Sequence, residues 1–434
     1  MPQLNLVLAL LAAVTAFAAL GRRVGVPGPI VFALGGLGLA LVPGLPPVAL
    51  APELVLLVFL PPLIFAAAQG TTWGEVRELA RPILLLAVAL VLATMTAVAV
   101  VAHALIPGFS WAEAFTMGAV VAPPDAVAAK AVADAVGLPH RQVRVLEGEG
   151  LFNDATALVA FQIASAAALT GAPFAPGAAA FQLARAVAVA VAVGVAVGWL
   201  GERVLARVGD PPAEATVTLL LPFAAYLGAE HWHGSGVIAV IAAALYLNRR
   251  RGDGVSDPGA SGTYPVPGPA PLARSHVQAL WGTLDFLLTG LSFVLVGLQV
   301  RFVMTGPEGQ PWPPGMALLS AVLVCLTAIA VRLAWMFATA PLVRPRPSRR
   351  VLLVSGWAGM RGVVSLAIAL SLPTVTAAGA PFRAREAIVL FTFVVIFGTL
   401  VGQGLTLPAL IRRVGLGGAG TKAARAAPAR PSLT

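Results

Sequence analysis

Charged residues are scarce in this sequence. Asp, Glu, Lys and Arg make up 11% of the 434 residues, whereas hydrophobic residues make up 59%. A soluble protein has about 25% charged residues, so a soluble globule of this length could not cover its surface with so few. Most of the outer surface must therefore face lipid, which excludes a set of soluble domains.

Cysteine is nearly absent, since only Cys325 is present and it lies within an apolar run. A disulfide framework and a cysteine-based metal site are thereby excluded. His231 and His233 have no Cys or further His at metal-ligand spacing, so we expect no zinc site. The net charge of +10 is explained by basic cytoplasmic loops, so we expect no nucleic-acid partner.

The motifs of enzymes and of ATP-driven pumps are also missing. The apolar runs contain no paired aspartates, no Ser–His pairing and no His-Glu-x-x-His motif, and the chain has no phosphate-binding loop. We therefore expect no enzymatic activity and no resident cofactor. Any transport by this chain would have to be driven by ion gradients.

Long apolar runs are what the sequence has instead. A helix needs about 20 mostly apolar residues to cross a bilayer, and the runs predict an all-α polytopic membrane protein of about thirteen spans. The predicted spans are 3–20, 28–43, 49–68, 82–106, 112–136, 144–170, 178–206, 213–229, 234–249, 276–301, 315–343, 350–373 and 385–412.

The positions of the basic residues support this division. Sixteen of them fall in loops after odd-numbered spans and three in loops after even-numbered spans. The positive-inside rule then places the odd loops and the C-terminal tail in the cytoplasm and the N-terminus outside. We expect a multi-pass protein of the plasma (inner) membrane.

Two segments lack this apolar character. Residues 250–275 are dense in Gly and Pro and are predicted to be a flexible cytoplasmic linker between two halves. Residues 415–434 combine Gly, Ala and Pro with scattered basic residues, which predicts a disordered cytoplasmic tail. Residues 1–414 then form one transmembrane domain. The long linker, with a Pro/Gly-interrupted region in each half, is typical of an inverted-repeat transporter.

The fifth predicted span is interrupted by Pro123, Pro124 and Asp125. Two consecutive prolines remove two backbone donors, so the helix must break within the membrane. Unwound backbone in lipid has to line a cavity or be covered by protein. The backbone carbonyl of Pro124 beside Asp125 would suit a monovalent cation. The alternative is a proline kink with Asp125 bonded to a neighbouring helix.

The sixth span places Asp154 about 15 Å deep, near mid-membrane. Glu149 and Asn153 share one helix face, and Asp154 points about 100° away from Asn153. Burial favours a protonated carboxyl group, whereas a bound cation favours the ionised form. Asp154 could therefore carry a proton or a cation in alternation, which would couple two opposite fluxes. The alternative is a buried structural acid.

Arg361 lies in the twelfth span and cannot lose its charge, so it needs a fixed partner at this depth. Glu149 is the predicted partner, and Glu147 is a second candidate. Alternatively, Arg361 could anchor an anionic substrate, which would indicate an anion or organic-acid transporter.

Five motifs in order along the chain resemble the monovalent cation:proton antiporter-1 family, the NhaP-type bacterial sodium/proton antiporters related to animal sodium/proton exchangers. The resemblance covers about residues 5–412. The motifs are PPDAVAAKAV (123–132), EGEGLFNDATALVAF (147–161), HGSGVIAVIAAALYLNRR (233–250), FVLVGLQVR (293–301) and GMRGVVSLAIALSLP (359–373).

The resemblance implies thirteen helices in two inverted repeats with broken crossing helices, and a homodimer in which a core moves against a dimerisation domain. It also implies antiport of a monovalent cation for a proton by alternating access. Asp154 would bind the cation and the proton in competition, with Asn153 implying one proton per cation. The other implied sites are Asp125, the backbone of Pro124 and Gly150, and an ion pair between Glu149 and Arg361.

The sequence departs from better-known members of that family at three positions. It has Pro124 where many have a threonine, Ala66 where many have a glutamate, and Gly150 where a serine is usual. The site then has fewer side-chain ligands, so potassium or lithium joins sodium as an expected substrate.

Overall fold

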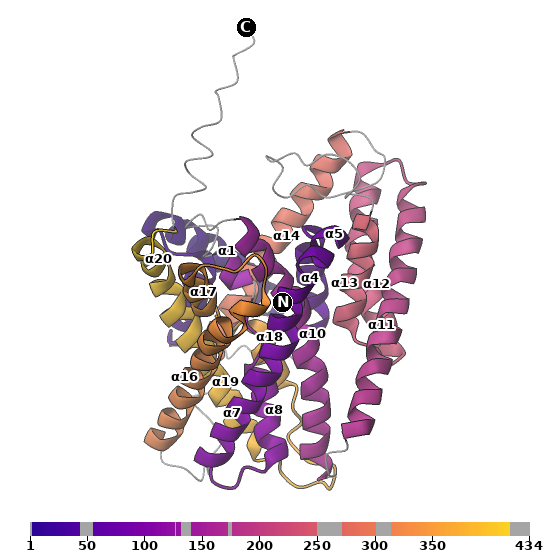
Figure 1. The fold of residues 1–434 in the computed structure, drawn as a ribbon. Helices are drawn as coiled ribbons and strands as arrows, with labels where there is room; N and C mark the ends of the chain where they lie inside the picture. The colour runs from indigo at the N-terminus through magenta and orange to yellow at the C-terminus, as the bar shows by residue number, and fades with distance from the viewer. Residues whose placement is uncertain are drawn as a thin grey trace.

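The computed structural model is a bundle of helices (Figure 1). The structure describes residues 2–43, 55–125, 127–131, 140–171, 176–249, 271–300 and 314–416. Within these ranges there is no β-strand, only an isolated bridge between Val375 and Pro381. The all-α prediction is therefore confirmed. The predicted linker core (250–270) and all but the start of the predicted tail (417–434) lie outside the described residues.

Each predicted span contains helix. In the first half the elements are α1 (Pro2–Val24), α2 (Gly28–Ala40), η1 (Val55–Phe59), α4 (Leu60–Gln69), α5 (Trp73–Glu78), α6 (Ala80–Leu84), η2 (Leu85–Leu90), α7 (Val91–Leu105), α8 (Trp111–Val121) and α10 (His140–Thr170). They continue with α11 (Pro176–Leu205), α12 (Pro211–His231), α13 (Gly236–Asn248), α14 (Pro271–Leu298), α16 (Pro314–Thr339), η4 (Ala340–Leu342), α17 (Arg349–Trp357), α18 (Val363–Leu370), α19 (Ala384–Phe397), η5 (Gly398–Gln403) and α20 (Gly404–Arg413).

The lengths of these helices fit a bilayer. Among the described residues, seven helices are long and apolar enough to cross a membrane, and three shorter apolar helices accompany them. The total of thirteen spans and the inverted-repeat relation stay predictions. Helices α11, α12 and α13 pack together on one side of the bundle, and α16, α17, α19 and α20 on the other (Figure 1).

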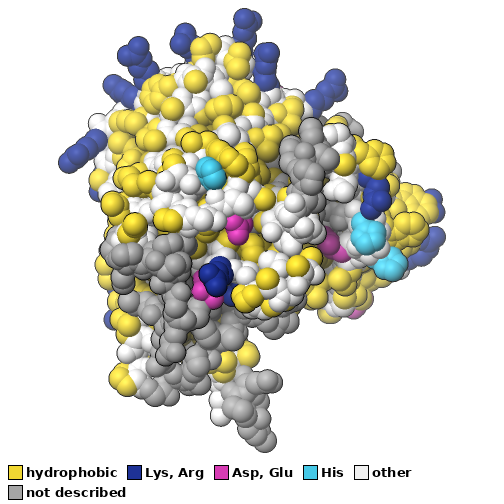
Figure 2. Space-filling view, turned by 90° about the horizontal axis from the view of Figure 1, so that it is seen from below, with side chains coloured by type: hydrophobic (Ala, Val, Ile, Leu, Met, Phe, Trp, Pro, Cys, Tyr) yellow, Lys and Arg dark blue, Asp and Glu magenta, His cyan; other side chains and the backbone are white. Residues whose placement is uncertain are grey.

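Apolar side chains cover much of the outer surface. Only 17% of the most apolar stretch of α11 is buried, and its exposed residues include Leu183, Val191 and Leu200. Seen from below, the Lys and Arg side chains lie mainly along the rim, and few charged side chains lie across the face (Figure 2). The exposed apolar side chains of α11 suit contact with lipid along the side of the bundle.

Two of the predicted spans are broken in their middle. The helix of α8 ends at Val121, the chain is unwound over 122–125, and helix resumes over 127–131. The predicted break at the two prolines is therefore confirmed. The span predicted over 350–373 is also two helices, because α17 ends at Trp357 and α18 begins at Val363. Gly359 and Gly362 lie in this second break, where glycine allows close backbone approach.

Helices α2 and α14 approach each other through glycines. A Cβ atom built on Gly297 would overlap the backbone carbonyl of Ala33, and one built on Gly36 would overlap that of Val294. Small residues allow membrane helices to pack backbone to backbone in this way. Any larger side chain at these positions must push the two helices apart.

Gly297→Val should therefore destabilise the bundle, because the added side chain meets rigid backbone. We expect a loss of about 1–3 kcal/mol, typical of overpacking, seen as a lower melting temperature in detergent. Gly282→Val on the same helix is the matched control, since nothing lies within 4 Å of a Cβ at that position. Equal melting temperatures for the two variants would contradict the close contact.

Candidate functional site

The two unwound segments meet each other. The backbone N–H of Asp125 donates to the carbonyl of Met360 over 2.6 Å. A Cβ atom on Gly362 would overlap the Asp125 carboxylate, so only glycine fits at this position. We call the contact between the unwound segments 122–125 and 358–362 the crossing. The break after α8 and the break between α17 and α18 are far apart in the sequence. They contact each other in the fold and form one structural unit.

Asp125 caps the helix that follows the first break. Its Oδ1 accepts hydrogen bonds from the backbone N–H groups of Val127 at 2.8 Å and Ala128 at 3.4 Å. A carboxylate at this position satisfies N–H groups that have no partner within the helix, and it faces the positive end of the helix dipole. Asp125 thus has a structural role in the break in addition to any role in binding.

Arg361 of the second break donates hydrogen bonds to backbone carbonyls of both breaks. It is 1% exposed, and its Nε donates to the carbonyl of Val121 over 3.1 Å while Nη2 donates to Ala122 over 3.4 Å. Nη1 donates to the carbonyl of Gly359. The carbonyls of Val121 and Ala122 lie at the end of α8 and that of Gly359 lies in the second break, where helical partners are missing, so the guanidinium group stabilises both breaks at once.

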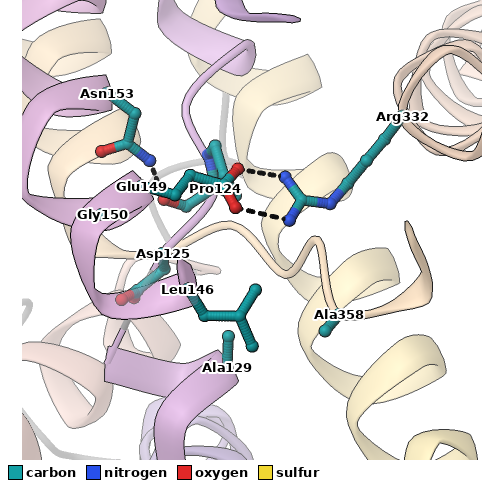
Figure 3. Close-up of a pocket in the computed structure, with 9 residues that line it drawn as sticks. All are labelled: Pro124, Asp125, Ala129, Leu146, Glu149, Gly150, Asn153, Arg332 and Ala358. Atoms are coloured by element: carbon teal, nitrogen blue, oxygen red, sulfur yellow. Dashed lines mark hydrogen bonds and ion pairs between the residues drawn. The ribbon is translucent and has the colours of Figure 1, made fainter. Parts of the chain in front are cut away.

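The predicted ion pair between Glu149 and Arg361 is wrong. Glu149, which is 1% exposed, instead forms a two-point pair with Arg332 of α16. The Nη2–Oε2 distance is 2.8 Å, and Figure 3 shows both contacts. Arg361 has backbone carbonyls as partners and does not need the carboxylate, whereas Arg332 lies in the middle of an apolar helix and does.

Asn153 ties α10 to the first break. Its Nδ2 donates to the carbonyl of Pro124 over 2.6 Å (Figure 3). Its Oδ1 is buried and has no hydrogen-bond partner among the described residues. A buried oxygen without a donor is destabilising unless a water molecule or a cation satisfies it. This oxygen is therefore free to act as a ligand.

A small cavity lies where these side chains meet (Figure 3). About 10 Å³ of it is open to the centre of a water molecule, which is room for about one water or one dehydrated cation. The lining residues come from both breaks and from α10 and α16: Pro124, Asp125, Ala129, Leu146, Glu149, Gly150, Asn153, Arg332 and Ala358.

Asp154 lies beside this cavity and not in its lining. It follows Asn153 on α10 and interacts electrostatically with Asp125. Among the residues that the structure describes, no group of three or more Asp, Glu, His or Cys side chains could hold a metal ion. Any cation here would need backbone and amide oxygens in addition to carboxylates.

Five of the residues singled out in the sequence therefore come together in the cavity lining, and two lie outside it. Those within are Pro124, Asp125, Glu149, Gly150 and Asn153, and those outside are Asp154 and Arg361. The structure adds Arg332, for which the sequence suggested no role. The available signal was a lone arginine in an apolar helix, which requires an acidic partner but does not say which one.

The family model for the transmembrane sodium/hydrogen exchanger matches residues 7–413. The chain belongs to the sodium/hydrogen exchanger family. The family consists of transporters and not of catalytic enzymes, so this sodium/hydrogen exchanger family member is a multi-pass membrane transporter.

Relatives of this family member carry matching names. It is 36% identical over 422 residues to an uncharacterised Na⁺/H⁺ exchanger of Mycobacterium tuberculosis, covering 94% of this chain and 74% of the relative. It is 32% identical over 423 residues to a sodium, potassium, lithium and rubidium/H⁺ antiporter of Bacillus pumilus, covering 93% and 60%.

The fold also matches a solved structure. The sodium proton antiporter MjNhaP1 of Methanocaldococcus jannaschii aligns with a TM-score of 0.70, covering 96% of this chain and 100% of the other at 18% identity. The predicted antiporter fold is thereby confirmed. The roles of individual residues in this exchanger family member rest on the geometry described above.

The partner of Glu149 can be tested by a double-mutant cycle. Arg332→Gln should lower stability by about 3–5 kcal/mol, because it leaves Glu149 as an unpaired buried charge. Adding Glu149→Gln should recover part of that loss. We expect the recovery in melting temperature of the purified protein.

The control cycle combines Glu149→Gln with Arg361→Gln, which loses bonds to backbone carbonyls that Glu149 does not share. Its coupling should be clearly smaller. A larger coupling with Arg361 than with Arg332 would restore the pair predicted from the sequence.

Proposed function

We propose that this chain exchanges a monovalent cation for a proton, with Asp154 as the group that carries either ion. The observation that supports this most is the crossing itself. It brings an unwound backbone, the carboxylate of Asp125 and the unpartnered Oδ1 of Asn153 together, and Asp154 follows Asn153 on α10 beside them. Oxygen ligands in a small buried cavity suit a hard cation.

Competition at Asp154 provides the coupling. Burial favours the neutral, protonated carboxyl group, and an incoming cation favours the ionised form, so the two ions exclude each other. The Asp125 carboxylate and the oxygens of Asn153, Gly150 and Pro124 complete the site. A cation can then enter only when the proton leaves, which is the requirement for exchange.

The ion set includes sodium, potassium and lithium. Part of the support is the naming of relatives, one of which is a sodium, potassium, lithium and rubidium/H⁺ antiporter. The other part is the composition of the site, since amide and backbone oxygens with few carboxylates discriminate weakly between monovalent cations. We propose exchange of one proton for one cation, with no net charge moved.

Transport follows alternating access in the plasma (inner) membrane. The basic loops face the cytoplasm, with the C-terminus inside and the N-terminus outside, as the distribution of Lys and Arg favours. The helices with breaks form the moving core of a homodimer. The broken helices support this, because a site at a break can be exposed to either side by a shift of the core.

The anion-transport alternative has lost its main support. It requires Arg361 to face a substrate. All three side-chain nitrogens of Arg361 donate to backbone carbonyls, and Arg361 does not line the cavity. Arg332 does line the cavity, yet Glu149 neutralises it. No cationic group remains in the described lining to attract an anion.

Asp154→Asn should abolish exchange, because asparagine cannot take up and release a proton. The assay is dye dequenching in everted vesicles of an antiporter-deficient host, on addition of NaCl, KCl or LiCl. Asp210→Asn is the matched control, since Asp210 is exposed at the start of α12 and asparagine caps a helix equally well.

Both variants must reach the membrane in equal amounts for the comparison to count. Residual cation-dependent dequenching in Asp154→Asn would overturn the mechanism. Absence of any response to the three cations in the unmodified protein would overturn the antiport itself.

The one-to-one exchange predicts that membrane potential has no effect on rate. In proteoliposomes, a membrane potential of either sign, set by a thiocyanate gradient because potassium is itself a proposed substrate, should leave sodium-driven proton movement unchanged. Asn153→Asp adds a second carboxylate beside Asp154 and should make the rate respond to the potential if the variant is active. A marked dependence on potential in the unmodified protein would contradict the proposed stoichiometry.

A further inference from the structure

A second cavity lies at one end of the bundle, away from the crossing. The starts of α6, η2, α10 and α17 and the end of α16 surround it. About 50 Å³ is open to the centre of a water molecule, against about 10 Å³ at the candidate ion site. Its walls are mostly apolar and include Leu86, Met336 and Leu352, which belong to one buried cluster.

The depth of this cavity corresponds to the membrane interface. Each lining helix contributes residues from its first two turns or its last two turns, which places the cavity within about 11 Å of the helix ends. The headgroups and upper acyl chains of lipids lie at this depth.

The rim of the cavity is strongly basic. The lining segments 80–86, 141–146 and 335–355 together contain seven arginines and no Asp or Glu. Arg144 forms ion pairs with Glu75 and Glu147, so six of the seven arginines contribute to the basic rim. Arg141 itself lines the cavity, and its side chain donates to the carbonyl of Arg344 over 3.5 Å. Five further arginines are exposed and lie within two residues of lining residues along the chain: Arg81, Arg344, Arg346, Arg349 and Arg350.

We propose that this cavity binds an anionic phospholipid. One acyl chain enters between the ends of α10, α16 and α17, and the phosphate lies over Arg141 and the Arg-Pro-Arg-Pro segment 344–347. An apolar slot and a basic rim match the two ends of such a lipid. Basic pockets between membrane helices recognise anionic headgroups through this combination.

Charge complementarity decides the occupant. The chain's own tail over 415–434 carries Lys422, Arg425 and Arg430 and no acidic residue, so the basic rim repels it. A zwitterionic lipid offers the same acyl chain but no net negative charge. An anionic lipid alone satisfies both parts of the cavity.

The bound lipid would act next to the candidate site. Ser355 lines this cavity, and its carbonyl accepts a hydrogen bond from Nε of Arg332 over 3.2 Å. Arg332 in turn holds Glu149. A lipid in the cavity would therefore stabilise the contact between α16 and α17. This contact positions Arg332 for its ion pair with Glu149.

The test is native mass spectrometry of the purified full chain in a neutral detergent with added dioleoylphosphatidylglycerol or dioleoylphosphatidylcholine. Arg344→Gln with Arg346→Gln should weaken phosphatidylglycerol binding about 30-fold, at about fivefold per arginine. Val351→Trp, which fills the cavity, should abolish specific retention. Val343→Trp at the rim provides a second filling variant should Val351→Trp fail to fold.

Arg22→Gln with Arg23→Gln is the matched control, because these two arginines are also exposed at a helix end but belong to α1, which does not line the cavity. Retention in this control, with loss in the other variants, supports the site. Equal loss in the control would show unspecific attraction and overturn the proposal. Unchanged binding in folded filling variants, or equal retention of phosphatidylcholine by the unmodified protein, would also overturn it.

Discussion

Unwound backbone inside a membrane must find hydrogen-bond partners within the protein, and this requirement determines the structure at the centre of the bundle. Each break in a helix exposes carbonyl and N–H groups that lipid cannot bond. Here the two breaks satisfy each other, since Asp125 donates its backbone N–H to Met360 and Asp125 also caps the next helix. Arg361 takes the carbonyls that remain at Val121 and Ala122. The site is therefore assembled from the same contacts that make the breaks stable.

This arrangement separates structural charges from those available for transport. Glu149 and Arg332 neutralise each other, and Arg361 is matched by the negative ends of two helices. Buried pairs of this kind contribute little net stability, yet removing one partner is strongly destabilising. They fix the geometry around the cavity without occupying it. Asp125, Asp154 and the oxygen of Asn153 are then the groups for which we propose ion binding.

The sequence was sufficient for the helices and for the position of the first break. Apolar runs of membrane-spanning length give each helix, and Pro123 with Pro124 leaves no way to continue a regular helix. The second break was less evident, because Gly359 and Gly362 permit unwinding without requiring it. The backbone of Asp125, which lies far away in sequence, decides that the chain unwinds there.

The partner of Glu149 could not be derived in the same way. Arg332 and Arg361 both lie in predicted apolar spans, and each needs neutralisation at that depth. The choice depends on which arginine meets the broken helix ends, and this is a property of the crossing and not of either helix alone. Helical periodicity gives the face of α10 on which Glu149 lies, but not the helix packed against that face.

The charges around the crossing also bear on the stoichiometry. With Asp125, Glu149, Asp154, Arg332 and Arg361 all ionised, this group of described residues has one negative charge in excess. One proton or one monovalent cation neutralises it, and both loaded forms have the same net charge. A core that crosses the membrane only when neutral would move one positive ion in each direction. Asparagine at position 153 maintains this balance, because an aspartate there would add a second negative charge and require a second positive ion.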